Sequence, residues 1–207
     1  MPRLSRPESQ ARTRARILEA ARELLARHGL AHCSVDAISE QAGFSKGAFY
    51  SNFDSKEAVF LELLREHTAE EQQKLTAALQ ASADPTTALR AVSLRIAKML
   101  EDPLWCRLSL EAQLAATRNP KWGELYAELQ AAELEATVAM LNYMQSRNQT
   151  RMPKREIRAL ARSILTFVYG LKLTGLQTSE PLPQKARFIE SNLAAILRPL
   201  LVAAEGR

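Results

Sequence analysis

The chain has little cysteine, little glycine and few aromatic residues. Its two cysteines among 207 residues cannot form a disulfide framework, which favours a reducing, cytoplasmic compartment. Its seven glycines come with no alternating β-branched segment long enough for a strand, which argues against a β-rich fold. No uncharged apolar run approaches the roughly 18 residues of a membrane-spanning helix, and the first arginines are not followed by the apolar stretch of a secretory signal. We therefore expect a folded cytoplasmic protein without a membrane partner.

The chain also lacks the common reactive motifs. It contains no Cys-x-x-Cys, no His-Glu-x-x-His, no phosphate-binding loop and no nucleophile elbow. Its three histidines, His28, His32 and His67, are not spaced as metal ligands with any cysteine or carboxylate pair. These absences predict that the protein is not an enzyme and that it uses neither a metal nor a cofactor.

The positive charge is modest but unevenly distributed. The 28 lysines and arginines exceed the 23 acidic residues by five, which alone is a weak sign of nucleic-acid binding. Residues 1–16 concentrate the excess, because one acidic residue, Glu8, stands there against five arginines: Arg3, Arg6, Arg12, Arg14 and Arg16. This stretch is either a solubilising disordered tail or a basic arm that lies along a phosphate backbone.

Proline residues mark the starts of the carboxy-terminal helices. Three of them follow an N-cap residue directly and so fit the first helical position, as in Asp84-Pro85, Asp102-Pro103 and Asn119-Pro120. Two more starts are expected at Pro153 and Pro183. The predicted helices cover residues 85–101, 103–118, 120–147, 153–177 and 183–198, with Pro199 bending or ending the last one. With four helices upstream, we predict an all-α fold of about nine helices.

The most informative segment reads SVDAISEQAGFSKGAFYSNFDSK and runs from Ser34 to Lys56. Ser34 can cap a short helix that Gly43 ends, and Ser45 can cap a second short helix directly afterwards. Two such helices form a helix-turn-helix, whose second helix can enter the major groove of DNA. Lys46 and Lys56 both open a helix, where the macrodipole disfavours cations. A lysine at these two positions does not stabilise its own helix, and the sequence shows no other use for its charge within the fold. The sequence therefore predicts an external phosphate beside each lysine.

These residues resemble the TetR family of bacterial transcriptional regulators. That family's pattern has Thr/Ser-Val, then Ile-Ala-x-x-Ala-Gly-Val-Ser, Tyr-x-His-Phe and Ser-Lys-Glu. It is matched here at residues 34–35, 38–45, 47, 50–53 and 55–57. The resemblance covers about residues 10–66, a third of the chain, with Asn52 in place of histidine, Phe44 in place of valine, and Phe49 in place of a smaller aliphatic residue. We expect Phe49 to face the core of the small domain.

The resemblance implies a repressor that binds a pseudo-palindromic double-stranded operator as a homodimer and is released by a small-molecule effector. It implies a DNA-binding domain over residues 1–57 and an effector and dimerisation domain over 58–207, linked by a helix that begins near residue 54. The predicted DNA contacts are Arg14, Ser34, Ser45, Lys46, Gly47, Ala48, Tyr50, Asn52 and Lys56. An architectural DNA-binding protein without an effector is the alternative, and an all-α enzyme is a remote third.

The two cysteines have different settings. Cys33 directly precedes Ser34, and a helix N-terminus can lower the pKa of a thiol. Two interpretations of Cys33 are therefore open: it senses redox state, or it is an inert, buried thiol. Cys106 follows Trp105, which indicates packing.

The carboxy-terminal two thirds carry two weaker predictions. Residues 153–177 are apolar nearly all round and the last helix has a long apolar stripe, which indicates either a dimer interface or one thick monomeric core. The predicted interface residues are Ile164, Val168, Leu171, Gly175, Ile189, Leu193, Ile196 and Leu197. Large adaptable side chains on the central helices predict either a pocket for a hydrophobic effector or an ordinary filled core. The candidate lining is Met99, Trp105, Leu108, Gln113, Trp122, Tyr126, Met140, Tyr143 and Phe167.

Overall fold

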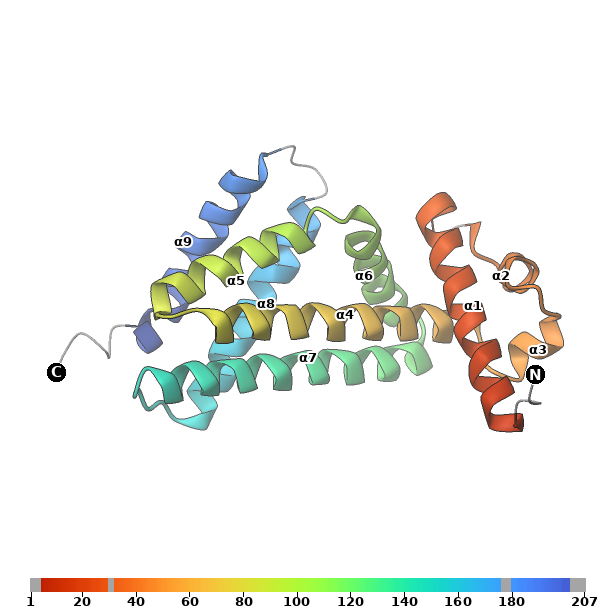
Figure 1. Ribbon diagram of the computed structural model, residues 1–207, viewed down its shortest axis with the longest axis horizontal. Coiled ribbons are helices and arrows are strands. Elements are labelled where there is room, and N and C mark those ends of the chain that lie inside the picture. The colour runs from red at the N-terminus through yellow and green to blue at the C-terminus, as the bar shows by residue number, and fades with distance from the viewer. Residues whose placement is uncertain (1–4, 30–31, 176–179, 202–207) are drawn as a thin grey trace. The chain divides into compact units, whose positions relative to one another are not determined.

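The computed structural model describes residues 5–29, 32–175 and 180–201. This part of the chain contains nine α-helices and no strand, which confirms the predicted all-α fold (Figure 1). The helices are α1 (Arg6–His28), α2 (Val35–Ala42), α3 (Lys46–Tyr50), α4 (Lys56–Ala81), α5 (Pro85–Met99), α6 (Pro103–Ala116), α7 (Pro120–Arg147), α8 (Lys154–Gly175) and α9 (Leu182–Leu201).

The N-caps predicted from the proline positions are present. Asp84 Oδ1 accepts hydrogen bonds from the N–H groups of Thr86 and Thr87 at 2.9 and 3.0 Å. The Thr87 hydroxyl also donates to Asp84 Oδ2, at 2.6 Å. This hydroxyl bond, followed by the backbone bonds, lowers the pKa of the Asp84 carboxyl. The prediction that the last helix ends or bends near Pro199 is wrong about its end, because α9 continues to Leu201. Pro199 lies in the final turn, where it removes a single backbone hydrogen bond, and the next residue, Leu200, is fully buried.

The basic amino-terminal stretch is helical from residue 6, so the alternative of a disordered tail is wrong for residues 6–16, and their contact with a phosphate backbone stays a prediction. Ser5 and Glu8 form a capping box: the Ser5 hydroxyl accepts from the Glu8 N–H at 3.4 Å, and Glu8 Oε2 accepts from the Ser5 N–H at 2.7 Å. These reciprocal bonds satisfy two donors at the helix start. The backbone bond from Ser5 is the main reason that the pKa of Glu8 is lowered. Arg3 lies outside the described residues.

The chain divides into two compact units by its packing. The first contains residues 1–67 and 107–125, and the second contains residues 68–106 and 126–207. Helices α4, α6 and α7 therefore each contribute residues to both units. The functional division at residue 57 that the sequence predicts stays a prediction.

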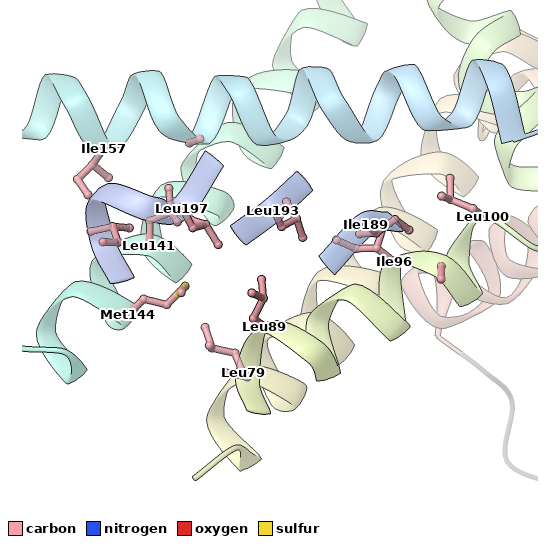
Figure 2. Packing of buried hydrophobic residues seen from close by; sticks show 14 of the residues in the cluster. Leu79, Leu89, Ile96, Leu100, Leu141, Met144, Ile157, Ile189, Leu193 and Leu197 are labelled. Carbon is pink, nitrogen blue, oxygen red and sulfur yellow. The ribbon is translucent and has the colours of Figure 1, made fainter. Parts of the chain in front are cut away.

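The core of the second unit forms where α9 packs along α5 (Figure 2). Ile189, Leu193 and Leu197 of α9 are buried in it together with side chains of α4, α5, α7 and α8. Their prediction as dimer-interface residues is therefore wrong, because the apolar stripe of α9 is covered within its own chain. The other predicted interface positions pack against this core and are partly buried: Ile164, Val168, Leu171 and Ile196. Gly175 ends α8, and its surroundings lie outside the described residues.

Candidate nucleic-acid interface

The helix-turn-helix is built by two serine caps and one glycine. The Ser34 hydroxyl accepts from the Ala37 N–H at 3.1 Å and starts α2. The Ser45 hydroxyl accepts from the Ala48 N–H at 3.2 Å and starts α3. Between them Gly43 has φ 75° and ψ 32°, a left-handed conformation that favours glycine, and it ends α2. The local signals of the sequence therefore produce the expected helix–turn–helix order.

One face of the short helix α3 is anchored in the first unit. Phe49 is fully buried, as predicted, and its ring lies 6.0 Å from that of Phe53 and 5.5 Å from that of Tyr50. Ile38 and Ala42 of α2 are buried as well. A helix of five residues cannot hold its own conformation in water, so this apolar anchor sets its orientation.

The other face of α3 is open to solvent. Lys46, Gly47 and Tyr50 are exposed, and Tyr50 leaves 56% of its surface accessible. The hydroxyl of a half-exposed tyrosine can donate a hydrogen bond to a phosphate oxygen. A Cβ added at Gly47 would meet the Ser45 hydroxyl at 3.7 Å, an ordinary contact, so the protein's own packing does not require glycine there. Helices α1, α2 and α3 lie together in this unit (Figure 1).

Lys46 has an internal partner that the sequence argument missed. Its Nζ lies 2.5 Å from Oδ1 of Asp36 in the first turn of α2, so the claim that the fold offers this cation no use is wrong. Both side chains are more than 60% exposed, at 62% and 63%, and such pairs contribute about 0–1 kcal/mol. The signal was available in the sequence, because Asp36 lies in the first turn of one helix of the motif and Lys46 lies in the first turn of the next. Lys56 has no carboxylate within ion-pair distance among the described residues, and it remains a candidate for phosphate.

Arg14 is held inside the first unit. Its Nη1 donates to the backbone oxygen of Asn52 at 2.6 Å, and its Nε donates to Glu62 Oε1 at 2.9 Å. Its guanidinium also lies 4.0 Å from the centre of the Phe53 ring. These contacts do not support the predicted DNA contact. They make Arg14 a positioning residue that ties α1 to α4 and to the residues after α3.

Asn52 also turns inward. Its Nδ2 donates to the backbone oxygen of Ala48 at 2.8 Å, and its Oδ1 is buried without a hydrogen-bond partner. The side chain therefore covers the end of α3, and the prediction that it contacts a phosphate or a base edge does not fit this conformation.

The cysteines are not activated. Cys33 is fully buried, and its thiol donates to the Gly29 carbonyl oxygen at 3.3 Å. Burial raises the pKa of Cys33, and that of Cys106, above the ordinary value, although the nearby Lys56 and Lys172 charges oppose it. A thiol without thiolate character is a poor redox sensor, so the alternative of an inert, buried cysteine holds for both residues.

The predicted pocket residues are not brought together in one unit. The first unit contains Leu108, Gln113 and Trp122. The Trp122 ring is buried there, and its Nε1 donates to the backbone oxygen of Ala112 at 2.8 Å. Gln113 is exposed, as is Tyr143 of the second unit, which does not fit a pocket lining. The remaining candidates lie in the second unit and are buried or partly buried: Met99, Trp105, Tyr126, Met140 and Phe167.

A polar cluster in the second unit was missed by the sequence reasoning. The Tyr169 hydroxyl of α8 donates to Oε2 of Glu133 on α7. Burial, followed by the charge of Glu133, raises the pKa of Tyr126 to about 12 and raises that of Tyr169 as well. Both phenols therefore stay neutral at physiological pH. A spacing of seven residues on α7, from Tyr126 to Glu133, was the available signal.

The described residues contain neither a membrane-spanning helix nor a metal site. No helix among them is both long and apolar enough to cross a bilayer. They also contain no group of three or more histidine, cysteine, aspartate or glutamate side chains arranged to hold a metal ion.

An all-helical chain with a short exposed helix, set at a left-handed glycine turn, defines a helix-turn-helix DNA-binding protein. Residues 17–63 match the sequence profile described as bacterial regulatory proteins, tetR family. The chain is 26% identical over 186 residues to the HTH-type transcriptional repressor AcnR of Corynebacterium efficiens, covering 87% of this chain and 92% of that one. It is 30% identical over 141 residues to the HTH-type transcriptional regulator EthR of Mycolicibacterium smegmatis, covering 67% and 63%.

Solved structures share the fold. A TetR transcription regulator from Haloarcula marismortui matches with a TM-score of 0.68 at 16% identity, covering 90% of this chain and 96% of that one. GusR of Salmonella enterica matches with a TM-score of 0.66 at 22% identity, covering 95% and 100%. Residues 17–63 therefore match the tetR family of bacterial regulatory proteins, and the chain is a DNA-binding transcriptional regulator.

Proposed function

We propose that the protein is a repressor that binds a pseudo-palindromic operator as a homodimer and leaves it when a small molecule binds the second unit. The observation that carries the proposal is the two-faced α3, whose Phe49 is fully buried while Lys46, Gly47 and Tyr50 are exposed. An anchored helix with a small residue and a cation on its open face suits the major groove. The similarity to the repressor AcnR supports the direction of regulation.

The proposed contacts divide by role. Ser34, Tyr50 and Lys56 contact phosphates and fix the position of the domain on the duplex. Ser45, Lys46, Gly47 and Ala48 form the groove-facing start of α3 and read base edges.

Footprinting on the DNA upstream of the protein's own gene tests the proposal. A dimer should protect two symmetric half-sites with centres about one helical turn, roughly 34 Å, apart. Equal affinity for every duplex would favour the architectural alternative. No binding to any duplex at low salt would contradict both.

Lys56→Ala should weaken binding to all duplexes alike and lower the slope of log affinity against log salt by about one, because one phosphate contact is lost. The measurement is a salt titration of duplex binding. Lys154→Ala is the matched control, since Lys154 also opens a helix and is exposed, but it lies in the second unit. An unchanged slope for Lys56→Ala, or an equal change for the control, would remove Lys56 from the contacts.

The proposed dimer interface uses the outer sides of α8 and α9. Phe188 and Leu173 are exposed by 54% and 58%, although both are large and apolar. The exposed Phe188 ring lies 6.3 Å from the partly buried Phe167 ring of α8, so apolar surface of α9 lies beside apolar surface of α8 there. Exposed apolar surface of this kind marks an association site, and a second copy can cover it through a two-fold interface.

Phe188→Glu should convert the dimer into a monomer, because a carboxylate in an apolar interface is left without a partner. Sedimentation should show the change, and operator affinity should fall by about a hundredfold as the second half-site contact is lost. Leu114→Glu is the control: Leu114 is exposed by 52% but lies in the first unit. A Phe188→Glu protein that stays dimeric would contradict this interface.

The proposed effector site includes the Tyr126, Glu133 and Tyr169 cluster, whose neutral phenols can act as hydrogen-bond donors. Helices α4, α6 and α7 each contribute to both units, so their backbones connect this site with the first unit. A ligand shifts DNA affinity only as far as it prefers one state of the protein. We therefore expect an effector to be a compound that both raises the Tm of the protein and lowers its operator affinity, as measured by thermal unfolding and by duplex titration.

A further inference from the structure

Asp36 and Lys46 form an ion pair on the exposed side of the helix-turn-helix. The pair joins the first turns of α2 and α3, with Nζ and Oδ1 2.5 Å apart and both side chains mostly exposed. The backbone of the motif does not need this pair, because the serine caps and Gly43 already define both helix boundaries. An acidic side chain beside a cation on the surface that meets a polyanion requires another explanation.

We propose that Asp36 is a specificity-determining residue that keeps Lys46 from contributing to non-specific DNA binding. The inference rests on the DNA-binding function proposed above. Non-specific binding is a sequence-independent attraction between cations and phosphates. In such non-specific binding, a lysine paired with a carboxylate acts as a dipole. The negative charge of the carboxylate cancels the positive charge that would attract the phosphate backbone of DNA.

The relative strength of the two contacts decides where Lys46 leaves Asp36. An exposed ion pair of this kind favours the closed arrangement by at most about fivefold. A good hydrogen bond from lysine to a guanine edge discriminates by about 5- to 150-fold. A correct base therefore offsets the loss of the pair, whereas a screened phosphate at a distance does not. Lys46 then becomes available on the matching sequence alone.

The test measures the ratio of two affinities for Asp36→Asn. The specific probe is a duplex that the wild-type protein enriches from a random pool of about 30 base pairs, and the non-specific probe is the same duplex with its sequence scrambled. We expect the scrambled duplex to bind up to about fivefold more tightly, with a salt slope larger by about one. Binding to the enriched duplex should change less, so that the specificity ratio falls.

Two further variants separate this effect from general repulsion. Glu40→Gln removes the same charge from the same helix, at an exposed position without an ion-pair partner in the described chain. This variant should bind both duplexes more tightly by the same factor, so that the ratio of the two affinities is unchanged. In a Lys46→Ala background, Asp36→Asn should no longer lower the ratio.

The outcomes distinguish the inference from the function on which it rests. An equal gain on both duplexes for Asp36→Asn, or no gain on either, would overturn the role of Asp36 while leaving DNA binding intact. A ratio that still falls in the Lys46→Ala background would overturn it too, because the effect would not pass through the pair. If the wild-type protein enriches no sequence or binds no duplex, the proposed function fails first.

Discussion

Phe49→Ala is expected to cost about 3–5 kcal/mol of unfolding free energy and to abolish operator binding. Phe49 is the fully buried aromatic side chain that holds the five-residue α3, and its truncation leaves a cavity next to Phe53. A loss of this size is a large share of the 5–15 kcal/mol typical of a folded domain. Chemical denaturation of the full chain, followed by duplex titration, measures both effects.

The adjacent residue provides the control. Tyr50→Ala removes a ring of similar size that is 56% exposed, so we expect a loss of about 1 kcal/mol from its edge contact with Phe49. Operator binding should nevertheless weaken, because the phenol hydroxyl is lost. If the two variants lost equal stability, the assignment of one face to the core and the other to DNA would be wrong.

Alanine should have opposite effects on stability at the two glycines of the motif. Gly43→Ala should cost about 1–2 kcal/mol, because Gly43 has φ 75° and side chains rarely adopt this conformation. Space is not the cause, since the nearest atom to an added Cβ is Arg16 Nη2 at 3.9 Å. Gly47→Ala should instead stabilise α3 by up to about 1 kcal/mol, as alanine favours helix.

The same Gly47→Ala protein should bind its operator at least about tenfold more weakly, because the new methyl group occupies the face that approaches the bases. Denaturation curves and duplex titrations on both glycine variants check the two predictions together. A Gly47→Ala protein that is more stable and binds with unchanged affinity would show that the bases do not approach α3 at this position.

The sequence predicted best those features whose causes lie within a few residues. Ser34, Ser45 and Asp84 cap helices because a serine or aspartate side chain reaches an N–H two or three residues ahead. Gly43 ends α2 for an equally local reason. Such signals fixed the helix order and the turn without any knowledge of tertiary packing.

The errors concern side chains whose partners lie far along the chain. Arg14 bonds to Asn52 and Glu62, which are 38 and 48 residues away, and its residue type indicates only that it can pair. The apolar stripe of α9 was assigned to a second copy, but α5 of the same chain covers it. The periodicity of apolar residues along a helix indicates that one face of the helix is buried. It does not indicate which other helix covers that face.

The buried state of both native thiols has a practical consequence for spectroscopy. Cys33 and Cys106 are buried and protonated at neutral pH, so maleimide reagents should spare them in the folded protein. A single new thiol at an exposed position of α1, such as Ala26→Cys, can then carry a spin label without removal of either native residue. If the protein forms the proposed homodimer, pulsed dipolar measurements would give the distance between the two labelled α1 helices, with and without a bound small molecule.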